Sequence, residues 1–469
     1  MQPHQFGATW ANVLQRYGRQ PAIYGNDQEV LRTFVDVESE RSAWRDTLSS
    51  LAKGSTLLVQ LAEDAAWPAI FLASLDLSLV IVPLEIEVAG QQLDNVVKVT
   101  RPHAVIRSNE FSRLHSDPPG WTGSQPDLLK ITSGTTGLPR AIRFRESQLL
   151  SDCLNICSSM GLVPEDVNFG AIPFAHSYGF SNLVTPILYQ GTGFVCSRDR
   201  LPRAMHRHIE NSPATVLPAT PAIFQALCSL SDCDRLGTVR ICISAGAPLP
   251  AETVQQFFRR FGLRIHSFYG SSECGGIMFD REGRLDAPSG FVGTPLVGVQ
   301  ITRLPNDRIE ITGTNVSDGY FPDQDPETLQ TGRFVPGDLV RWLGESAQLY
   351  GRASDFINIA GKKIHPSLVE EHIRKVPGVI EVIAFGVPSP NRNEDLVALV
   401  MSNPPIARQT LEAHCRAGLA DWQVPRDFQI VTELPVNARG KIKRSELAAE
   451  YVARRGNSPE ARSRIADSK

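Results

Sequence analysis

Short apolar runs separated by helix-length segments set the strongest constraint on how this 469-residue chain folds. Residues 57–61 read Leu-Leu-Val-Gln-Leu and residues 79–82 read Leu-Val-Ile-Val, with a helical pattern between them. This order predicts a parallel sheet with covered faces, because parallel neighbours need a long crossover, usually a helix. The same alternation continues, with strands predicted at 103–106, 214–217 and 239–243 and helices at 5–20, 220–229 and 251–261. The first two thirds of the chain are therefore predicted to be α/β.

The character of the sequence changes near residue 280. Gly, Pro and Asp become dense between residues 290 and 338, and strand patterns at 299–304 and 308–312 predict a β-rich subdomain. After residue 352 a compact unit begins that mixes helix and strand patterns. The tail after residue 450 carries few apolar residues, so we expect residues 451–469 to be disordered.

Composition narrows the class of protein and its partners. Hydrophobic residues make up 42% and charged residues 21%, which excludes a disordered, collagenous or disulfide-dominated chain. The net charge of -3 gives no electrostatic reason to expect nucleic acid as a partner. The eight cysteines form no C-x-x-C pair, which favours reduced thiols in a cytoplasmic protein. The N-terminus lacks a signal-peptide pattern, and Pro68 and Asp76 interrupt the most apolar stretch, so no membrane span is expected.

A loop rich in Ser, Thr and Gly is the sharpest local feature. Residues 131–140 read Ile-Thr-Ser-Gly-Thr-Thr-Gly-Leu-Pro-Arg. Glycines let the backbone turn its N–H groups toward an anion, and the hydroxyls add donors, as in phosphate-binding nests. The spacing is not that of a Walker A loop. A plain flexible surface loop is the alternative that this segment leaves open by itself.

Residues 268–276, Phe-Tyr-Gly-Ser-Ser-Glu-Cys-Gly-Gly, follow an apolar stretch and so lie at a strand end. The ring of Tyr269 can stack on a base there. Glu273, among small residues, can hold Mg²⁺, which prefers oxygen ligands. The alternative is a turn with a solvated glutamate.

Three further motifs carry chemistry. Asp338 follows a turn glycine, where an acid can bind ribose hydroxyls or simply close a β-turn. Gly361-Lys362 and Gly440-Lys441 each place a lysine after a glycine hinge. Such a lysine can deliver a positive charge to a phosphate or carboxylate, or remain a solvated basic loop.

Taken together and in this order, the motifs resemble the adenylate-forming (AMP-binding) superfamily of acyl- and aryl-CoA synthetases, luciferases and stand-alone adenylation enzymes. The resemblance runs from about residue 8 to about residue 448. The segments that carry it are 132–140, Pro173-Phe174-Ala175-His176, Gly246–Leu249, Tyr269–Glu273, Gly337-Asp338, Gly351-Arg352, Gly361–Ile364 and Pro435–Lys441.

The resemblance implies an α/β fold in two parts. A large N-terminal domain of mixed sheets with helices, plus the β-rich subdomain, is expected over residues 1–352. A hinge is expected at 353–355, with Asp355 as the pivot, and a small, mobile α+β C-terminal domain at 356–450.

The resemblance also implies roles for individual residues. Candidate catalytic residues are Lys441, Glu273 and His176, with Glu273 also the candidate Mg²⁺ ligand. Candidate phosphate-binding residues are Thr132, Ser133, Gly134, Thr135, Thr136, Gly137 and Arg140. The other candidate cofactor-binding residues are Gly246, Ala247, Pro248 and Tyr269 in an adenine slot, Asp338 and Arg352 at the ribose, Gly361 on the pantetheine path, and Ser272. The candidate substrate pocket comprises His176, Ser177, Gly270, Cys274 and Gly275.

The function implied is an AMP-forming ligase that uses ATP and Mg²⁺ to make an acyl-adenylate and passes the acyl group to coenzyme A. Ala175 stands where relatives that activate amino acids carry an Asp, which favours an aryl or fatty acid as the small-molecule substrate. One alternative is an adenylation enzyme that loads the phosphopantetheine of an acyl carrier protein. A second is a catalytically silent nucleotide-binding homologue, which is expected to lack Lys441, Glu273 or Asp338; all three are present.

Overall fold

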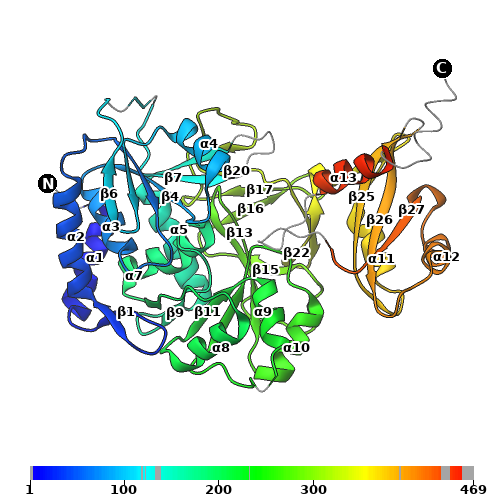
Figure 1. Cartoon of the computed structure of the whole chain (residues 1–469), viewed down its shortest axis with the longest axis horizontal. Helices are drawn as coiled ribbons and strands as arrows, with labels where there is room; N and C mark the ends of the chain where they lie inside the picture. Colours follow the sequence, from blue (N-terminus) through cyan, green and yellow to red (C-terminus); the bar gives the residue numbers. More distant parts are fainter. Residues whose placement is uncertain are drawn as a thin grey trace. The chain divides into compact units, whose positions relative to one another are not determined.

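The computed structural model describes residues 4–117, 120–121, 123–132, 139–231, 233–389, 392–434 and 444–456 (Figure 1). It separates into two compact units. The first comprises Met1–Pro336 and Arg341–Gln348, and the second Gly337–Val340 and Leu349–Lys469. The hinge predicted at 353–355 and the boundary at 352 stay predictions.

A seven-stranded sheet confirms the first strand–helix–strand pattern. Its order is β18 (Tyr320–Phe321), β8 (Arg140–Phe144), β7 (Leu128–Thr132), β4 (Val80–Leu84), β3 (Thr56–Gln60), β5 (Ala104–Arg107) and β6 (Glu110–Arg113). Strands β7, β4, β3 and β5 are parallel, and β6, β8 and β18 add antiparallel edges. Every residue of β3 and β4 is buried, as continuous apolar strands of a covered parallel sheet should be.

A second sheet has eleven strands, and its last two, β22 and β21, are divided between the units. Its order is β2 (Val30–Thr33), β1 (Pro21–Tyr24), β10 (Gly193–Val195), β9 (Val167–Phe169), β11 (Val216–Ala219), β12 (Ile241–Ser244), β13 (Ile265–Ser271), β14 (Gly275–Phe279), β15 (Phe291–Pro295), β22 (Ser346–Arg352) and β21 (Asp338–Leu343). From β1 to β13 the neighbours along β10, β9, β11 and β12 are parallel. Their carboxyl ends therefore meet at one edge of the sheet, where ligands of such sheets bind.

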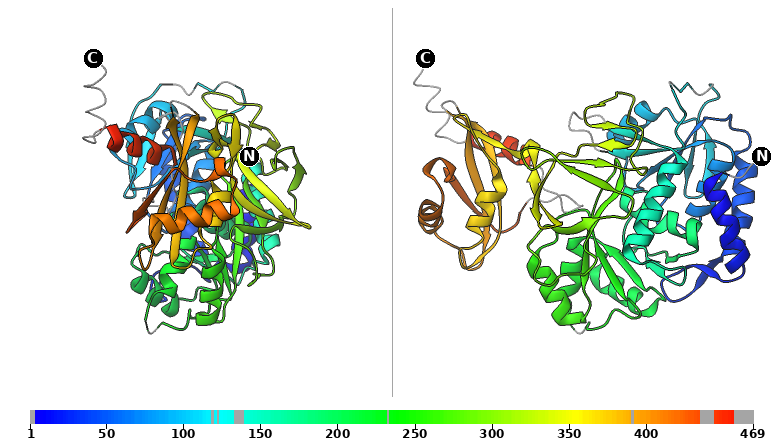
Figure 2. Two further views of the ribbon diagram at one scale, coloured as in Figure 1. Left: turned by 90° about the vertical axis from the view of Figure 1, so that its right-hand side faces the viewer. Right: turned by 180° about the vertical axis from the view of Figure 1, so that it is seen from behind.

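Helices cover these sheets (Figures 1 and 2). Their bounds in the first unit are α1 (Gln5–Tyr17), α2 (Phe34–Leu48), α3 (Trp67–Asp76), α4 (Gly90–Thr100), α5 (Glu146–Met160), α6 (Ser177–Gly179), the π-helix η1 (Phe180–Val184), α7 (Thr185–Gln190), α8 (Pro202–Asn211), α9 (Pro221–Cys228) and α10 (Ala251–Phe261). Side chains of α8, α9 and α10 form one apolar core with β9, β11, β12 and β13. Helix α5 packs against α7 and β14, which places it beside the segment that contains Glu273. Among the helices that the structure describes, none is long and apolar enough to cross a membrane.

The segment predicted as a β-rich subdomain is divided among three sheets. Strands β16 (Gln300–Arg303), β17 (Ile309–Thr312), β20 (Arg333–Phe334) and β19 (Leu329–Gln330) form a separate four-stranded sheet. In contrast, β18 joins the seven-stranded sheet, and β15, β21 and β22 join the eleven-stranded one. Strand patterns in a sequence reveal strands but not their partners, so this division is not visible in the sequence.

The second unit is a small sheet with helices on both faces (Figure 2). Its elements are η2 (Ala353–Asp355), β23 (Ile357–Ile359), β24 (Lys362–Ile364), α11 (Pro366–Ile373), β25 (Val379–Ser389), β26 (Asn393–Ser402), α12 (Arg408–Gly418), η3 (Asp421–Gln423), β27 (Asp427–Val431) and α13 (Arg444–Gly456). Because side chains alternate along β25, Val382 and Ala384 pack with α11, whereas Ile383 and Phe385 pack with α13. Helix α13 continues to Gly456 and so includes residues 451–456, the first six of the predicted disordered tail. Residues 457–469 lie outside the described part.

Candidate functional site

The two ends of the Ser/Thr/Gly loop are fixed opposite each other. Thr132 ends β7 and Arg140 begins β8, and the two residues are partners across this antiparallel pair. The Thr132 hydroxyl also donates to the Arg140 carbonyl oxygen over 3.3 Å. The candidate residues Ser133, Gly134, Thr135, Thr136 and Gly137 lie outside the described residues. The stem that presents the loop is thus part of the seven-stranded sheet.

A chain of contacts links this stem to Glu273. The Arg140 guanidinium lies over the ring of Tyr320, 3.8 Å from its centroid, a cation–π contact. Arg140 is also 3.7 Å from the carboxylate of Asp325. The Tyr320 hydroxyl donates to Glu273 Oε1 over 3.1 Å. Burial raises the pKa of Tyr320 most, and the charge of the Glu273 carboxylate raises it further. The structure therefore brings together Arg140 and Glu273, which are 133 positions apart in the sequence, through a tyrosine that no motif singled out.

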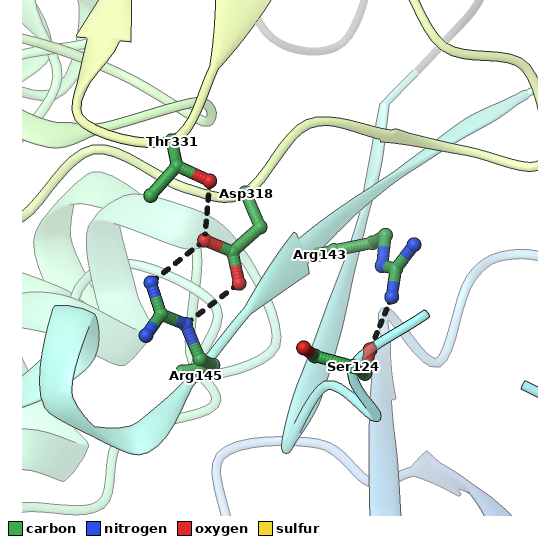
Figure 3. Close-up of a pocket in the computed structure, with 5 residues that line it drawn as sticks. All are labelled: Ser124, Arg143, Arg145, Asp318 and Thr331. Atoms are coloured by element: carbon green, nitrogen blue, oxygen red, sulfur yellow. Dashed lines mark hydrogen bonds and ion pairs between the residues drawn. The ribbon is translucent and has the colours of Figure 1, made fainter. Parts of the chain in front are cut away.

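A polar pocket of about 330 Å³ lies next to β8. Ser124, Arg143, Arg145, Asp318 and Thr331 line it (Figure 3). Arg145 donates from Nε and Nη2 to the Asp318 carboxylate over 2.7 and 2.8 Å, and Thr331 donates to the same group over 3.0 Å. These bonds outweigh burial and lower the pKa of Asp318. The network holds the turn that leads into Tyr320, so we assign these side chains a structural role.

The carboxyl edge of the eleven-stranded sheet gathers the other candidate residues of the first unit. Gly246, Ala247 and Pro248 follow β12, and Tyr269 lies in the neighbouring parallel strand β13. Gly246 has a φ of +89°, a left-handed conformation that glycine adopts without strain. Tyr269 is 6% exposed. The predicted adenine slot is thus composed of segments that are neighbours in space.

The loop after β9 reaches the same edge. His176 precedes the short helix α6, and its Nδ1 accepts the N–H of Tyr178 over 3.2 Å. Tyr178 is buried and donates its hydroxyl to the carbonyl oxygen of Ile243 in β12 over 3.0 Å. Ser177 donates to the hydroxyl of Ser272 over 3.0 Å. Two candidates that are 95 positions apart are therefore in direct contact.

The segment from Glu273 to Gly276 is held from two sides. Asn315 donates from Nδ2 to the Cys274 carbonyl oxygen over 2.6 Å, and the Ser317 N–H donates to the Glu273 carbonyl oxygen over 3.1 Å. From α5, Asp152 accepts the N–H of Gly276 over 2.8 Å. Gly275 has a φ of +71°, and a Cβ there would lie 2.2 Å from the Asp152 carboxylate. Gly275 therefore permits this close approach as well as turning the chain.

Two buried ionisable residues, Asp152 and Lys130, lie near this segment. Asp152 is 1% exposed and also accepts the hydroxyl of Ser181 over 2.7 Å. Burial raises the pKa of Asp152, and the nearby Lys130 opposes that shift. Burial lowers the pKa of Lys130, and the negative charge of Asp152 acts in the other direction and raises it. Lys130 Nζ lies 4.4 Å from the centroid of Phe144 and has no hydrogen-bond partner among the described residues.

We expect the change Asp152→Ala to lower the free energy of unfolding by about 1–3 kcal/mol. The change leaves the Gly276 N–H and the Ser181 hydroxyl without their acceptor and removes the opposite charge near the buried Lys130. Urea denaturation of the whole chain measures this. Adding Lys130→Met to that variant should recover part of the loss, since it removes the uncompensated ammonium. Equal stability of the single and double variants would show that Asp152 does not balance Lys130.

The remaining candidates belong to the second unit. Arg352 donates from Nε to Asp338 Oδ1 over 3.0 Å, so the two predicted ribose-binding residues are in contact. Gly361 has a φ of +85° in the turn between β23 and β24, and its N–H donates to Asn358 Oδ1 over 3.0 Å. Lys441 lies outside the described residues.

Sequence reasoning missed Tyr320, Asp152 and Lys130. Tyr320 stands in a stretch of Gly, Pro and Asp that reads as turns. Asp152 occurs in an ordinary helical pattern. Only Lys130 could have been noticed in the sequence, because it interrupts the apolar run 128–131, where a buried strand is expected.

Comparisons with known proteins agree with this arrangement. A family model described as AMP-binding enzyme matches residues 115–315, and one described as AMP-binding enzyme C-terminal domain matches residues 368–441. Feruloyl-CoA synthase of an Amycolatopsis species is 27% identical over 367 residues, which cover 74% of each chain. Sulfoacetate–CoA ligase of Cupriavidus necator is 29% identical over 380 residues, covering 76% of this chain and 73% of the relative. The crystal structure of ATP-bound MatB from Rhodopseudomonas palustris has the same fold, with a TM-score of 0.82 at 21% identity over 94% of this chain and 98% of that one.

Proposed function

Because this chain belongs to the AMP-binding enzyme family, we propose that it is an AMP-forming acid–thiol ligase. It activates a carboxylic acid with ATP to an acyl-adenylate and pyrophosphate. The acyl group then passes to the thiol of coenzyme A, and AMP leaves. Relatives that are named as CoA ligases support this reaction class.

The strongest support for this proposal is the set of contacts that connects the candidate residues of the first unit. The stem of the predicted phosphate loop, through Arg140 and Tyr320, reaches the predicted metal-binding Glu273. The loops that contain His176 and Gly246 meet at the adjoining sheet edge, where ligands of such sheets bind. The residues that we assign to phosphate, metal and nucleoside thus lie on connected elements of the first unit, which supports the proposal.

The chemistry explains why these residue types are needed. A carboxylate and a polyphosphate repel each other, so the enzyme must neutralise both and hold them in line. We assign the loop from Thr132 to Gly137 to the β- and γ-phosphates. Asp338 and Arg352 take the ribose hydroxyls. Lys441 bridges the carboxylate and the α-phosphate in the first half-reaction.

The residues present fit a magnesium ion. Glu273 offers carboxylate oxygens, the ligands that Mg²⁺ prefers, and Tyr320 orients that carboxylate. The described residues hold no cluster of three metal-ligating side chains. That is compatible with Mg²⁺, which is commonly held by one or two carboxylates together with substrate phosphates. When bound, the ion offsets charge on the phosphate oxygens.

We propose an aryl or fatty acid as the substrate. Ala175 offers no carboxylate for a substrate amine, and Ser177 and Ser272 present hydroxyls at the predicted pocket. We also propose a cytoplasmic location, which the eight free cysteines support. A carrier-protein phosphopantetheine is the second candidate acceptor.

Acid-dependent exchange of labelled pyrophosphate into ATP tests the proposal. Aryl, medium-chain, long-chain and amino acids are each supplied with Mg²⁺ and the whole chain. We expect exchange with one class of aryl or fatty acid, followed by thioester formation when coenzyme A is added. Thioester formation with a phosphopantetheinylated carrier protein alone would favour the second acceptor. Absence of exchange with every class, despite ATP binding, would contradict the proposal and favour the silent homologue.

A further inference from the structure

One arginine in the second unit joins three segments that are distant from it in the sequence. Arg444 begins α13, three positions after the candidate catalytic Lys441. Its guanidinium donates from Nη1 to Asp355 Oδ2 and from Nη2 to Glu370 Oε1, each over 2.8 Å. Its Nε donates to the carbonyl oxygen of Ala384 over 3.0 Å. All three donor nitrogens are therefore used.

Two of these partners form a rigid frame. Glu370 lies on α11 with its side chain 6% exposed, and Oε1 also accepts the N–H of Ala384 over 2.8 Å. Ala384 lies within β25, which pairs with β26 along nearly its whole length. An anchor on Glu370 and Ala384 is thus an anchor on the folded core of the second unit.

The third partner lies in the predicted hinge. Asp355 is the last residue of η2, and its side chain is 22% exposed. Burial by itself lowers the pKa of the Arg444 guanidinium, but Glu370 and Asp355 together raise it above its usual range. Two carboxylates on one arginine, in a largely buried place, make a strong and directional anchor.

We propose that Arg444 is a positioning residue for the adenylation half-reaction, fastening the end of the Lys441 segment to both the frame and the hinge carboxylate of Asp355. This proposal rests on the function proposed above. Three residues of extended chain span at most about 11 Å, so an anchor at Arg444 limits where a lysine three positions earlier can reach. The bond to Asp355 couples that limit to the hinge.

The test compares the two half-reactions in Arg444→Met, Arg444→Lys and Asp355→Asn. Pyrophosphate exchange reports adenylation, and thioester formation from a supplied acyl-adenylate reports transfer. We expect Arg444→Met to lower the turnover of exchange up to about 100-fold, as small misplacements of reacting groups do. Transfer should fall much less, and Arg444→Lys should recover part of the exchange. Asp355→Asn keeps the frame anchor and should give a smaller loss of exchange.

Arg408→Met is the matched control. Arg408 also makes two side-chain bonds in the second unit, to Asp427 Oδ1 and to the Arg426 carbonyl oxygen, each over 2.8 Å. It touches neither the hinge nor the frame, so both half-reactions should stay at the wild-type level. The proposal would be overturned if Arg444→Met lost both half-reactions equally, or if it exchanged pyrophosphate at the wild-type rate.

A second measurement does not depend on activity. Hydrogen–deuterium exchange by mass spectrometry compares residues 353–358 and 435–443 in the same variants. Arg444→Met and Asp355→Asn should each accelerate hydrogen–deuterium exchange in both segments, whereas Arg408→Met should not. If hydrogen–deuterium exchange of residues 435–443 is unchanged in these variants, the coupling between Asp355 and the Lys441 segment is overturned, even if the chain proves to be a ligase. If the variants show faster hydrogen–deuterium exchange but the wild-type chain shows no exchange of pyrophosphate into ATP, the proposed function is contradicted and the coupling is retained.

Discussion

Replacing Lys441 with alanine is expected to lower acid-dependent pyrophosphate exchange by about 10²–10³-fold, the usual effect of removing one preorganised group that stabilises developing charge. The negative carboxylate must approach a negative α-phosphate, and the ammonium group is assigned to offset both charges. Thioester formation from a supplied acyl-adenylate should be much less affected, because the carboxylate is already activated. Single-turnover assays of each half-reaction measure the difference.

Lys443 supplies the matched control for this prediction. It lies two positions further along the same segment and does not align with the family's catalytic lysine. Lys443→Ala should therefore leave both half-reactions near the wild-type rate. Equal losses of both half-reactions in Lys441→Ala would contradict the assigned role.

Glu273→Ala should lower exchange at low Mg²⁺ by about 100-fold or more, since Lewis-acid stabilisation by a bound ion is worth several kcal/mol. Raising the Mg²⁺ concentration should restore part of the rate, because the substrate phosphates still bind the ion. Tyr320→Phe removes only the hydroxyl that donates to Glu273 Oε1. We expect a loss of about tenfold from it, as for other partners that orient metal ligands.

A Mg²⁺ titration of exchange separates these roles. Wild type, Tyr320→Phe and Glu273→Ala should need successively higher Mg²⁺ for half of their maximal rate. If the rate of Glu273→Ala does not respond to Mg²⁺, the carboxylate has a structural role, such as holding Tyr320 and the stem of the phosphate loop.

Local patterns predicted many of the elements that position the site. The helix predicted at 251–261 is α10, with the same bounds, and the strand predicted at 308–312 is β17, which begins one residue later. The runs at 57–61 and 79–82 are β3 and β4, displaced by one or two residues. Such elements are visible because their periodicity depends on neighbours in the sequence.

Pairings between distant segments were not predictable in this way. Tyr320 reaches Glu273 because β18 pairs with β8, and the strand has only two residues. Asp152 supports Gly276 from a helix 124 positions earlier in the chain. Neither contact leaves a periodic signal, so single-sequence reasoning finds the motifs and misses the side chains that hold them in place.

The covered thiol of Cys274 has a consequence for the lifetime of a working ligase. An acyl-adenylate is an acylating agent, and Cys274 directly follows the carboxylate assigned to the metal. The side chain is fully buried, and burial raises the pKa of its thiol far above the usual range. Since the thiolate is the reactive form, we expect this cysteine to resist self-acylation. In a working ligase the acceptor thiol would then meet no competition from this cysteine.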